Sequence, residues 1–161
     1  MAAAPRDLID EDLSEFFRGP VSAILASVDA MNVPDATRVM GLAALGPQRL
    51  RILVSNDART AQTNAQPGAR VAVLVTDITN YRSIQLKGAV VTGAHDRTAG
   101  DMALVHHHID TFCEAGPKVG LTPAGAARFF TLDVVAIVLD VDDHYDQTPG
   151  PGAGRRIVAS R

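Results

Sequence analysis

Arginines and hydroxyl-bearing residues are grouped in the first half of the chain in an order that suits phosphate binding. Arg38 lies in a predicted strand, Ser55 and Asn56 end a second predicted strand, and Arg59 and Thr60 stand in the first turn of a predicted helix. A guanidinium group binds phosphate oxygens through paired hydrogen bonds, and the unpaired amide hydrogens of a helix start attract an anion. Each arginine alone is typical of a solvated surface, so it is the grouping that predicts a phosphate site.

Three consecutive histidines, His106 to His108, form a second group of chemically active side chains. Successive residues of a helix point about 100° apart, so three neighbours cannot converge on one metal ion. We therefore predict no metal site, and we expect His106 to be packed or half-exposed at the border of an apolar helix face. Cys113 is the only cysteine and suits a small core residue.

Sequence motifs for serine hydrolysis, zinc catalysis and phosphate binding by a glycine-rich loop are absent from the chain. The sequence therefore shows no recognisable set of residues for ordinary acid–base or nucleophilic catalysis. This absence favours a bound cofactor as the source of any chemistry.

Composition and charge exclude several classes of protein. The 161 residues include five phenylalanines, two tyrosines and no tryptophan, and the formal net charge is −3. Single-stranded nucleic acid needs exposed aromatic rings and duplex DNA needs a basic surface, so we expect no nucleic-acid partner. No apolar run reaches the roughly 20 residues that cross a bilayer, and acids occupy the N-terminal stretch where a secretory signal would be apolar. We predict a soluble domain in the reducing cytoplasm, because a lone cysteine forms no internal disulfide.

The elements that position these residues follow from the apolar pattern and from the Gly and Pro residues that bound it. Strands are predicted at 21–28, 36–45, 49–55, 69–76, 82–94 and 131–141. Helices are predicted at 7–18, at 57–66 with Asp57 as N-cap, and at 98–115, with a helical turn near 123–129. This order predicts a mainly β (α+β) fold, a six-stranded antiparallel barrel with two or three flanking helices.

The chain is predicted to divide into a barrel domain, residues 1–145, and a tail rich in Pro and Gly, residues 146–161. The tail has no apolar core of its own. It is expected to be a flexible end or an arm that wraps on a neighbour.

Three stretches together resemble the pyridoxamine 5′-phosphate oxidase-like FMN-binding split barrels. They are VSAILASVDAMNVPDATRVMGLAAL, LRILVSNDARTAQTNAQPGARVAVLVTD and YRSIQLKGAV. The resemblance covers roughly residues 8–95 and, more loosely, the last strand. It implies a six-stranded split β-barrel, FMN at the interface of a homodimer, and hydride transfer between an unassigned small substrate and flavin N5.

The resemblance also implies roles for individual residues. Ser55, Arg59 and Thr60 would hold the FMN phosphate, Arg38 would contact its phosphate side, and Asn56 would belong to the cofactor-binding set. The cofactor-binding set is completed by the backbone of Val39, Met40 and Gly41 along the isoalloxazine edge, and by Ser83 and Gln85 on one strand face, with Gln85 reaching the ring of the partner subunit.

The chain departs from strict members of this family at three points. Ala43 stands where they carry a lysine, Ala58 and Thr60 flank Arg59 where they use Ser and Lys, and the tryptophan of their C-terminal segment is missing. Pyridoxamine 5′-phosphate oxidase activity itself is therefore not expected. Two alternatives stay open, a split barrel that binds F420 or haem and a non-catalytic flavin-binding or sensing dimer.

Overall fold

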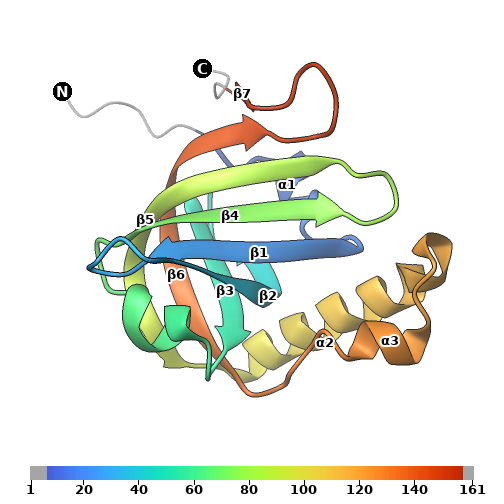
Figure 1. The fold of residues 1–161 in the computed structure, drawn as a ribbon, viewed down its shortest axis with the longest axis horizontal. Helices are drawn as coiled ribbons and strands as arrows, with labels where there is room; N and C mark the ends of the chain where they lie inside the picture. Colours follow the sequence, from blue (N-terminus) through green and yellow to red (C-terminus); the bar gives the residue numbers. More distant parts are fainter. Residues whose placement is uncertain (1–6, 158–161) are drawn as a thin grey trace.

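Six long antiparallel strands close into a barrel in this computed structural model, which describes residues 7–157 (Figure 1). The strands are β1 (Val21–Val28), β2 (Pro34–Ala44), β3 (Arg49–Ser55), β4 (Arg70–Asp77), β5 (Ser83–Asp96) and β6 (Val134–Asp146). The sheet order is β3-β2-β1-β4-β5-β6, and pairing of β3 with β6 closes the ring. The predicted six-stranded antiparallel barrel is confirmed. Residues 1–6 of the predicted barrel domain and residues 158–161 of the predicted tail lie outside the described residues.

The barrel forms because alternate residues of each strand are apolar and point inward. In β1, for example, Val21, Ala23 and Leu25 are fully buried, whereas Ala26 and Val28 are exposed. The inward residues of all six strands join one apolar core, which α1 (Glu11–Phe16) extends with Leu13 and Phe16.

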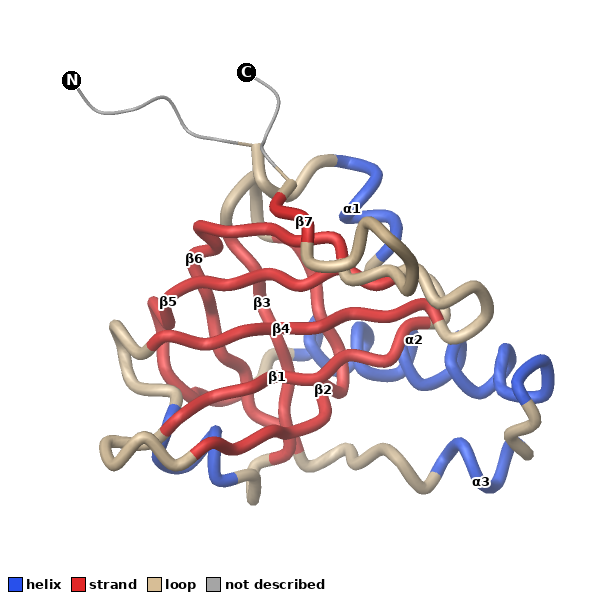
Figure 2. Tube along the Cα trace, turned by 45° about the horizontal axis from the view of Figure 1, so that its top comes forward, coloured by secondary structure: helices blue, strands red, loops and turns tan. Residues whose placement is uncertain are grey.

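Helix α2 (Ala99–Ala115) lies outside the barrel beside β2, and the short α3 (Pro123–Ala127) lies near the far end of α2 (Figure 2). A second apolar cluster fills the space between α2 and the barrel; it contains Met40, Leu53 and Val105. A 3₁₀ helix (Gly116–Val119) follows α2.

A buried ion pair ties the start of α2 to the barrel. The Arg51 guanidinium of β3 donates two hydrogen bonds to the Asp101 carboxylate, at 2.6 and 2.5 Å, and contacts His95 Nε2 of β5 at 3.2 Å. Asp101 also completes a capping box with Thr98. Hydrogen bonding from Arg51 lowers the pKa of Asp101 to about 2.

Barrel closure requires a close approach of β5 and β6 at Gly88. A Cβ atom at this position would lie 2.1 Å from the carbonyl oxygen of Asp140, and the strand register shifts between Lys87 and Gly88. The two backbones meet here because glycine leaves the space of a side chain free.

The predicted helix 7–18 is shorter in the structure, where α1 spans Glu11–Phe16, and two further elements differ more strongly. The predicted helix 57–66 is wrong in extent: a five-residue π-helix, η1 (Thr60–Asn64), stands there, and Asp57 accepts a hydrogen bond from Ser55 instead of capping a helix. Short polar side chains favour such local bonds over a longer helix. The last strand does not stop at 141, because pairing with β5 carries β6 to Asp146.

The tail folds back on the barrel of the same chain. Arg155 and Arg156 form β7, which pairs with Tyr145 and Asp146 at the end of β6. Arg156 also pairs with Asp143. The described part of the tail is therefore not a free end, and both an arm on a neighbour and the boundary at 145 stay predictions.

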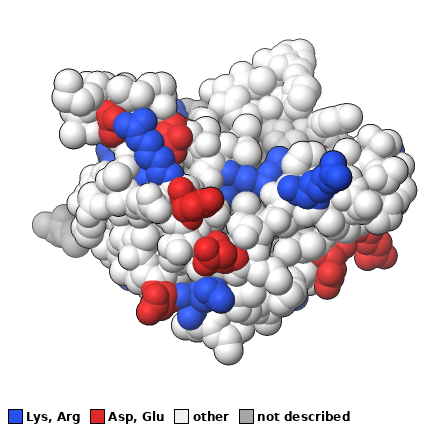
Figure 3. All heavy atoms as spheres, turned by 60° about the horizontal axis from the view of Figure 1, so that its bottom comes forward, with Lys and Arg blue, Asp and Glu red and all other residues white. Residues whose placement is uncertain are grey.

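Basic and acidic side chains lie next to one another on the face shown in Figure 3, in which the lower side of Figure 1 is turned forward. That face therefore has a mixed charge. Along residues 7–157, none of the helices combines the length and the apolar content needed to cross a bilayer.

Candidate cofactor-binding site

A groove of about 540 Å³ opens on the outer face of the sheet where β1, β2, β4 and β5 lie side by side. Its floor is built from Ala26, Ala36 and Ala72, which are direct neighbours across three strands. Val28 and Pro34 line the same groove. We call this space the alanine groove; a floor of methyl groups is flat, apolar and suited to a planar ring.

The next row along the same face carries two of the predicted ligands. Arg38 pairs with Ile24, Ile24 with Leu74, and Leu74 with Gln85, so all four side chains point outward together. Because neighbouring strands lie about 4.8 Å apart, Arg38 and Gln85 are separated by roughly 14 Å. The structure thus brings these two residues to one face without bringing them into contact.

Two cations border the alanine groove. Arg70 is paired with Asp142 of β6, whereas the Lys87 ammonium lies 4.7 Å from the ring centroid of Tyr145. Within residues 7–157, Lys87 forms no ion pair. Its charge is therefore available to a ligand in the groove.

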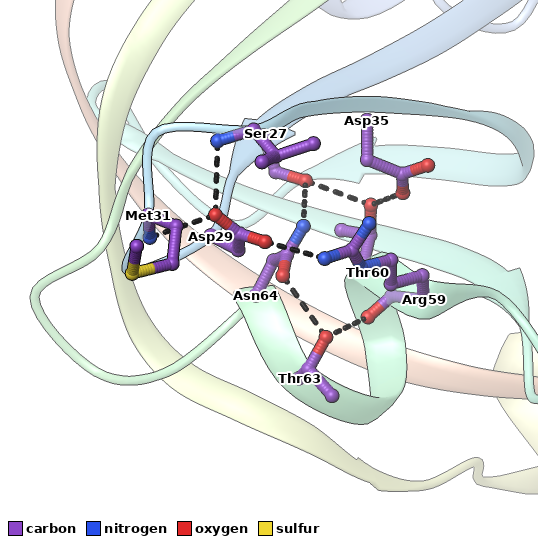
Figure 4. Close-up of polar contacts among 9 residues, drawn as sticks. Ser27, Asp29, Met31, Asp35, Arg59, Thr60, Thr63 and Asn64 are labelled. Atoms are coloured by element: carbon purple, nitrogen blue, oxygen red, sulfur yellow. Dashed lines mark hydrogen bonds and ion pairs between the residues drawn. The ribbon is translucent and has the colours of Figure 1, made fainter.

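Arg59 and Thr60, two of the predicted phosphate ligands, lie beside this groove where η1 begins after β3 (Figure 4). The Thr60 hydroxyl is fully buried; it donates to Asp35 at 2.7 Å and contacts Ser27 Oγ at 2.9 Å. The Asn64 amide donates to the same Ser27 oxygen at 3.0 Å. Arg59 is paired with Asp29 of the β1–β2 turn.

The other predicted phosphate ligands have different partners. Ser55 donates to Asp57 at 2.5 Å, and the backbone amide of Asn56 donates to the Asp133 carbonyl. Arg38 donates to Ser22 Oγ at 3.0 Å, and its guanidinium lies 4.8 Å from the ring centroid of Phe129. Burial lowers the pKa of Arg38 from its usual value. The structure does not bring Arg38 to Arg59.

The stretch predicted along the flavin edge is covered in this structure. Val39 points into the barrel core and is fully buried, and Met40 packs in the cluster under α2. A Cβ atom on Gly41 would lie 3.4 Å from the backbone of Val105 in α2. A role for this stretch in cofactor binding stays a prediction.

Ser83 and Gln85 share the outer face of β5, as predicted from the alternation of the strand. Ser83 is buried and contacts the Thr76 hydroxyl at 2.9 Å. The Gln85 carbonyl oxygen accepts a hydrogen bond from Gln147 at 3.4 Å. Gln85 is half-buried and keeps a position from which it could reach a ligand on this face.

We name residues 55–60, with the carboxylates that bind them, the Ser55–Thr60 corner. Asp29 pairs with the Arg59 guanidinium, Asp35 accepts from Thr60, and Asp57 accepts from Ser55. The pKa of Asp29 is lowered, first by a hydrogen bond from the Val33 amide, so this carboxylate stays charged. Three carboxylates and one guanidinium thus meet at the corner, whereas the alanine groove is flat and apolar.

The alanines of the groove were missed in the sequence because alanine carries no chemical signal. The alternation of 21–28 and 69–76 could have placed Ala26 and Ala72 on an outer face. Nothing local indicates that these positions align across three strands, because register is set by pairing between distant segments.

The histidines of α2 have three different surroundings. His106 is exposed, His107 Nε2 contacts the carbonyl oxygen of Arg18 at 2.9 Å, and His108 is 2% exposed. The difference arises because the buried face of α2 includes Val105, His108 and Phe112. Burial lowers the pKa of His108 to about 4, with smaller effects of Arg38 and His107. Among residues 7–157, no cluster of three His, Cys, Asp or Glu residues is placed to hold a metal ion.

Known structures show which fold this barrel has. The crystal structure of HupZ from Group A Streptococcus aligns with a TM-score of 0.55 at 13% identity, over 91% of this chain and 99% of that chain. A pyridoxamine 5′-phosphate oxidase-related, FMN-binding protein of Nostoc punctiforme aligns with a TM-score of 0.50 at 15% identity, over 94% and 89%. An F420 reductase aligns with a TM-score of 0.50 at 24% identity, over 84% and 98%.

These alignments define the chain as a split β-barrel. Its fold is that of the pyridoxamine 5′-phosphate oxidase-like FMN-binding proteins, as the sequence resemblance predicted. No protein-family model matches the sequence, and no curated protein matches it either.

Proposed function

We propose that this protein binds a flavin, with the isoalloxazine ring on the floor of the alanine groove, and that it acts as a flavin-dependent oxidoreductase. The alignment of Ala26, Ala36 and Ala72 into one flat apolar floor is the observation that carries this proposal. The volume of about 540 Å³ lies within the range of small-molecule and cofactor sites. The FMN-binding neighbour of the same fold supports the choice of a flavin.

The residues around the groove have distinct roles in this proposal. Bound flavin would supply hydride transfer with an unassigned small substrate. The alanine floor would hold one face of the ring and exclude water from it. The Lys87 ammonium would stabilise negative charge on the ring, and Gln85 would donate a hydrogen bond to a ring on the same face.

We propose further that a second copy of the chain covers this face, giving a homodimer with the cofactor at the interface. Ile24, Leu74 and Val28 place apolar surface beside the groove, and Leu74 and Val28 are exposed. An apolar sheet face of this kind is typical of an interaction site. A cytoplasmic location stays a prediction from the single cysteine.

The absorption spectrum of the purified protein tests the proposal directly. We expect bound flavin, or saturable binding of added flavin, and a dimer by sedimentation. Ala72→Leu fills the groove and should weaken flavin binding by at least about tenfold. The matched change Ala94→Leu, at an exposed position of β5 outside the groove, should leave binding unchanged. A wild-type protein that stays colourless and ignores added flavin would falsify the proposal.

F420 is the second candidate, because an F420 reductase has the same fold at 24% identity. A deazaflavin and a flavin have different absorption spectra, so the same measurement separates them. Haem has less support in this chain, because His108 is buried and His107 is hydrogen-bonded to the backbone. A sensing dimer without turnover would bind flavin but would not be reduced by any donor tested.

A further inference from the structure

The charge of the Ser55–Thr60 corner is opposite to that of a phosphate site. Asp29, Asp35 and Asp57 contribute three negative charges, and Arg59 contributes the only positive charge among the residues that bond to one another there. Figure 4 shows Asp29 directed at Arg59 and Asp35 directed at Thr60. A dianion brought to this corner meets net repulsion.

Three side-chain donors that a phosphate would use are already bonded to carboxylates of this chain. Arg59 donates to Asp29, the buried Thr60 hydroxyl to Asp35, and Ser55 to Asp57. A phosphate oxygen that binds these side chains must compete with the carboxylates. A displaced carboxylate would then lie unpaired next to the incoming anion.

No nearby guanidinium offsets this charge. Arg70, which lines the groove together with Asp35, is paired with Asp142. Arg38, on the same strand as Asp35, is bonded to Ser22 and lies over the Phe129 ring. The amide of Ala58 is also engaged, because it donates to the Ser55 carbonyl.

We infer that the Ser55–Thr60 corner excludes phosphate. Its hydrogen bonds and ion pair instead hold η1 against β2 and against the β1–β2 turn. A flavin in the alanine groove is therefore held by its ring and its neutral side chain, and the phosphate-free flavin riboflavin binds at least as tightly as FMN. The statement on flavins rests on the proposed function, whereas exclusion of phosphate does not.

Titration with inorganic phosphate, followed by the backbone amide signals of residues 58–60 in NMR spectra, tests the exclusion without any flavin. We expect no saturable shift up to millimolar phosphate, relative to sodium chloride at equal ionic strength. A saturable shift in the wild-type protein overturns the inference.

The double variant Asp29→Asn/Asp57→Asn tests whether charge is the cause. Both carboxylates are on the surface turns of the corner, and their removal frees Arg59 and Ser55 to bind phosphate. We expect phosphate affinity to rise about tenfold or more, since two repulsive charges are removed. Asp110→Asn, at an exposed position of α2, is the matched control and should change nothing. A folded double variant with no gain overturns the role of charge.

Parallel titrations with riboflavin and FMN test the consequence for the ligand. In the wild-type protein we expect riboflavin to bind at least as tightly as FMN, and any deficit of FMN to shrink as salt screens the repulsion. Tighter binding of FMN that weakens with salt contradicts the inference. If neither flavin binds, the proposed function fails, and the phosphate titration still decides the exclusion.

Discussion

Arg59 and Thr60 show how far the chemistry of single residues could be predicted. Their types and their place after a strand were visible in the sequence, and both are strong donors. Their acceptors come from a turn and a strand far earlier in the chain, since Asp29 lies 30 positions before Arg59 and Asp35 lies 25 positions before Thr60. Local patterns do not reveal which distant carboxylate a donor will meet, so the partners could not be predicted.

The buried imidazole of His108 should make the stability of the protein depend on pH. Its pKa is about 4 when folded and 6.5 as the ordinary value, so the unfolded chain binds more protons between these pH values. The free energy of unfolding therefore falls as pH decreases from 6.5 to 4, by about 3 kcal/mol from this residue. Urea denaturation across this pH range measures the effect.

The variant His108→Leu should remove most of this slope. His144, whose pKa is also lowered by burial, keeps a smaller share. His106→Leu changes an exposed histidine of the same helix and should retain the slope of the wild-type protein. Equal slopes in all three proteins would show that His108 is protonated in the folded state.

At the scale of elements, the limits of a strand were predictable where turn residues bound it on both sides. β1 and β3 begin and end at the predicted residues, because Pro20 and Gly46-Pro47 interrupt the apolar runs. The end of β6 was missed, because its polar residues 142–146 are held by pairing with β5 and β7. The groove was missed for the same reason, since it exists only in the register of several strands.

The position of α2 should depend on the Arg51–Asp101 ion pair. Asp101→Ala leaves the guanidinium of Arg51 unpaired in a site where it is 17% exposed, and also removes the capping box. We expect a loss of about 3 kcal/mol in the free energy of unfolding, together with faster amide exchange in the first turn of α2.

The ion pair between Arg49 of β3 and Asp140 of β6 is the control for the Arg51–Asp101 pair. Arg49 and Asp140 are each 50% exposed, so water already screens their charges. Asp140→Ala should therefore cost less than about 1 kcal/mol. Similar losses in the two variants, or unchanged exchange in α2, would contradict the role given to Asp101.

At the scale of the whole molecule, closure of the barrel should be most sensitive at Gly88. Gly88→Ala places a methyl group where only 2.1 Å separates it from the Asp140 carbonyl, so β5 and β6 must move apart. We expect severe destabilisation, of about 3 kcal/mol or more, or failure to fold. Thermal unfolding followed by circular dichroism measures it.

Gly152→Ala is the control, because nothing lies within 4 Å of a Cβ atom at that position of the β6–β7 turn. This variant should unfold within a few degrees of the wild-type protein. A Gly88→Ala protein as stable as the Gly152→Ala protein would mean that β5 and β6 can separate without loss.

Pairing of β3 with β6 also orders the events of folding. Arg49 meets Asp140 and Ser55 meets Val134, so the ring closes between segments that leave the ribosome far apart in time. Until β6 emerges, β3 and β5 each present an open edge with unpaired backbone groups, which invites pairing with other chains. The entropy cost of bringing β3 and β6 together arises before their contacts stabilise the barrel, so we expect slow folding. We expect aggregation to be concentrated in nascent chains that stop before residue 134.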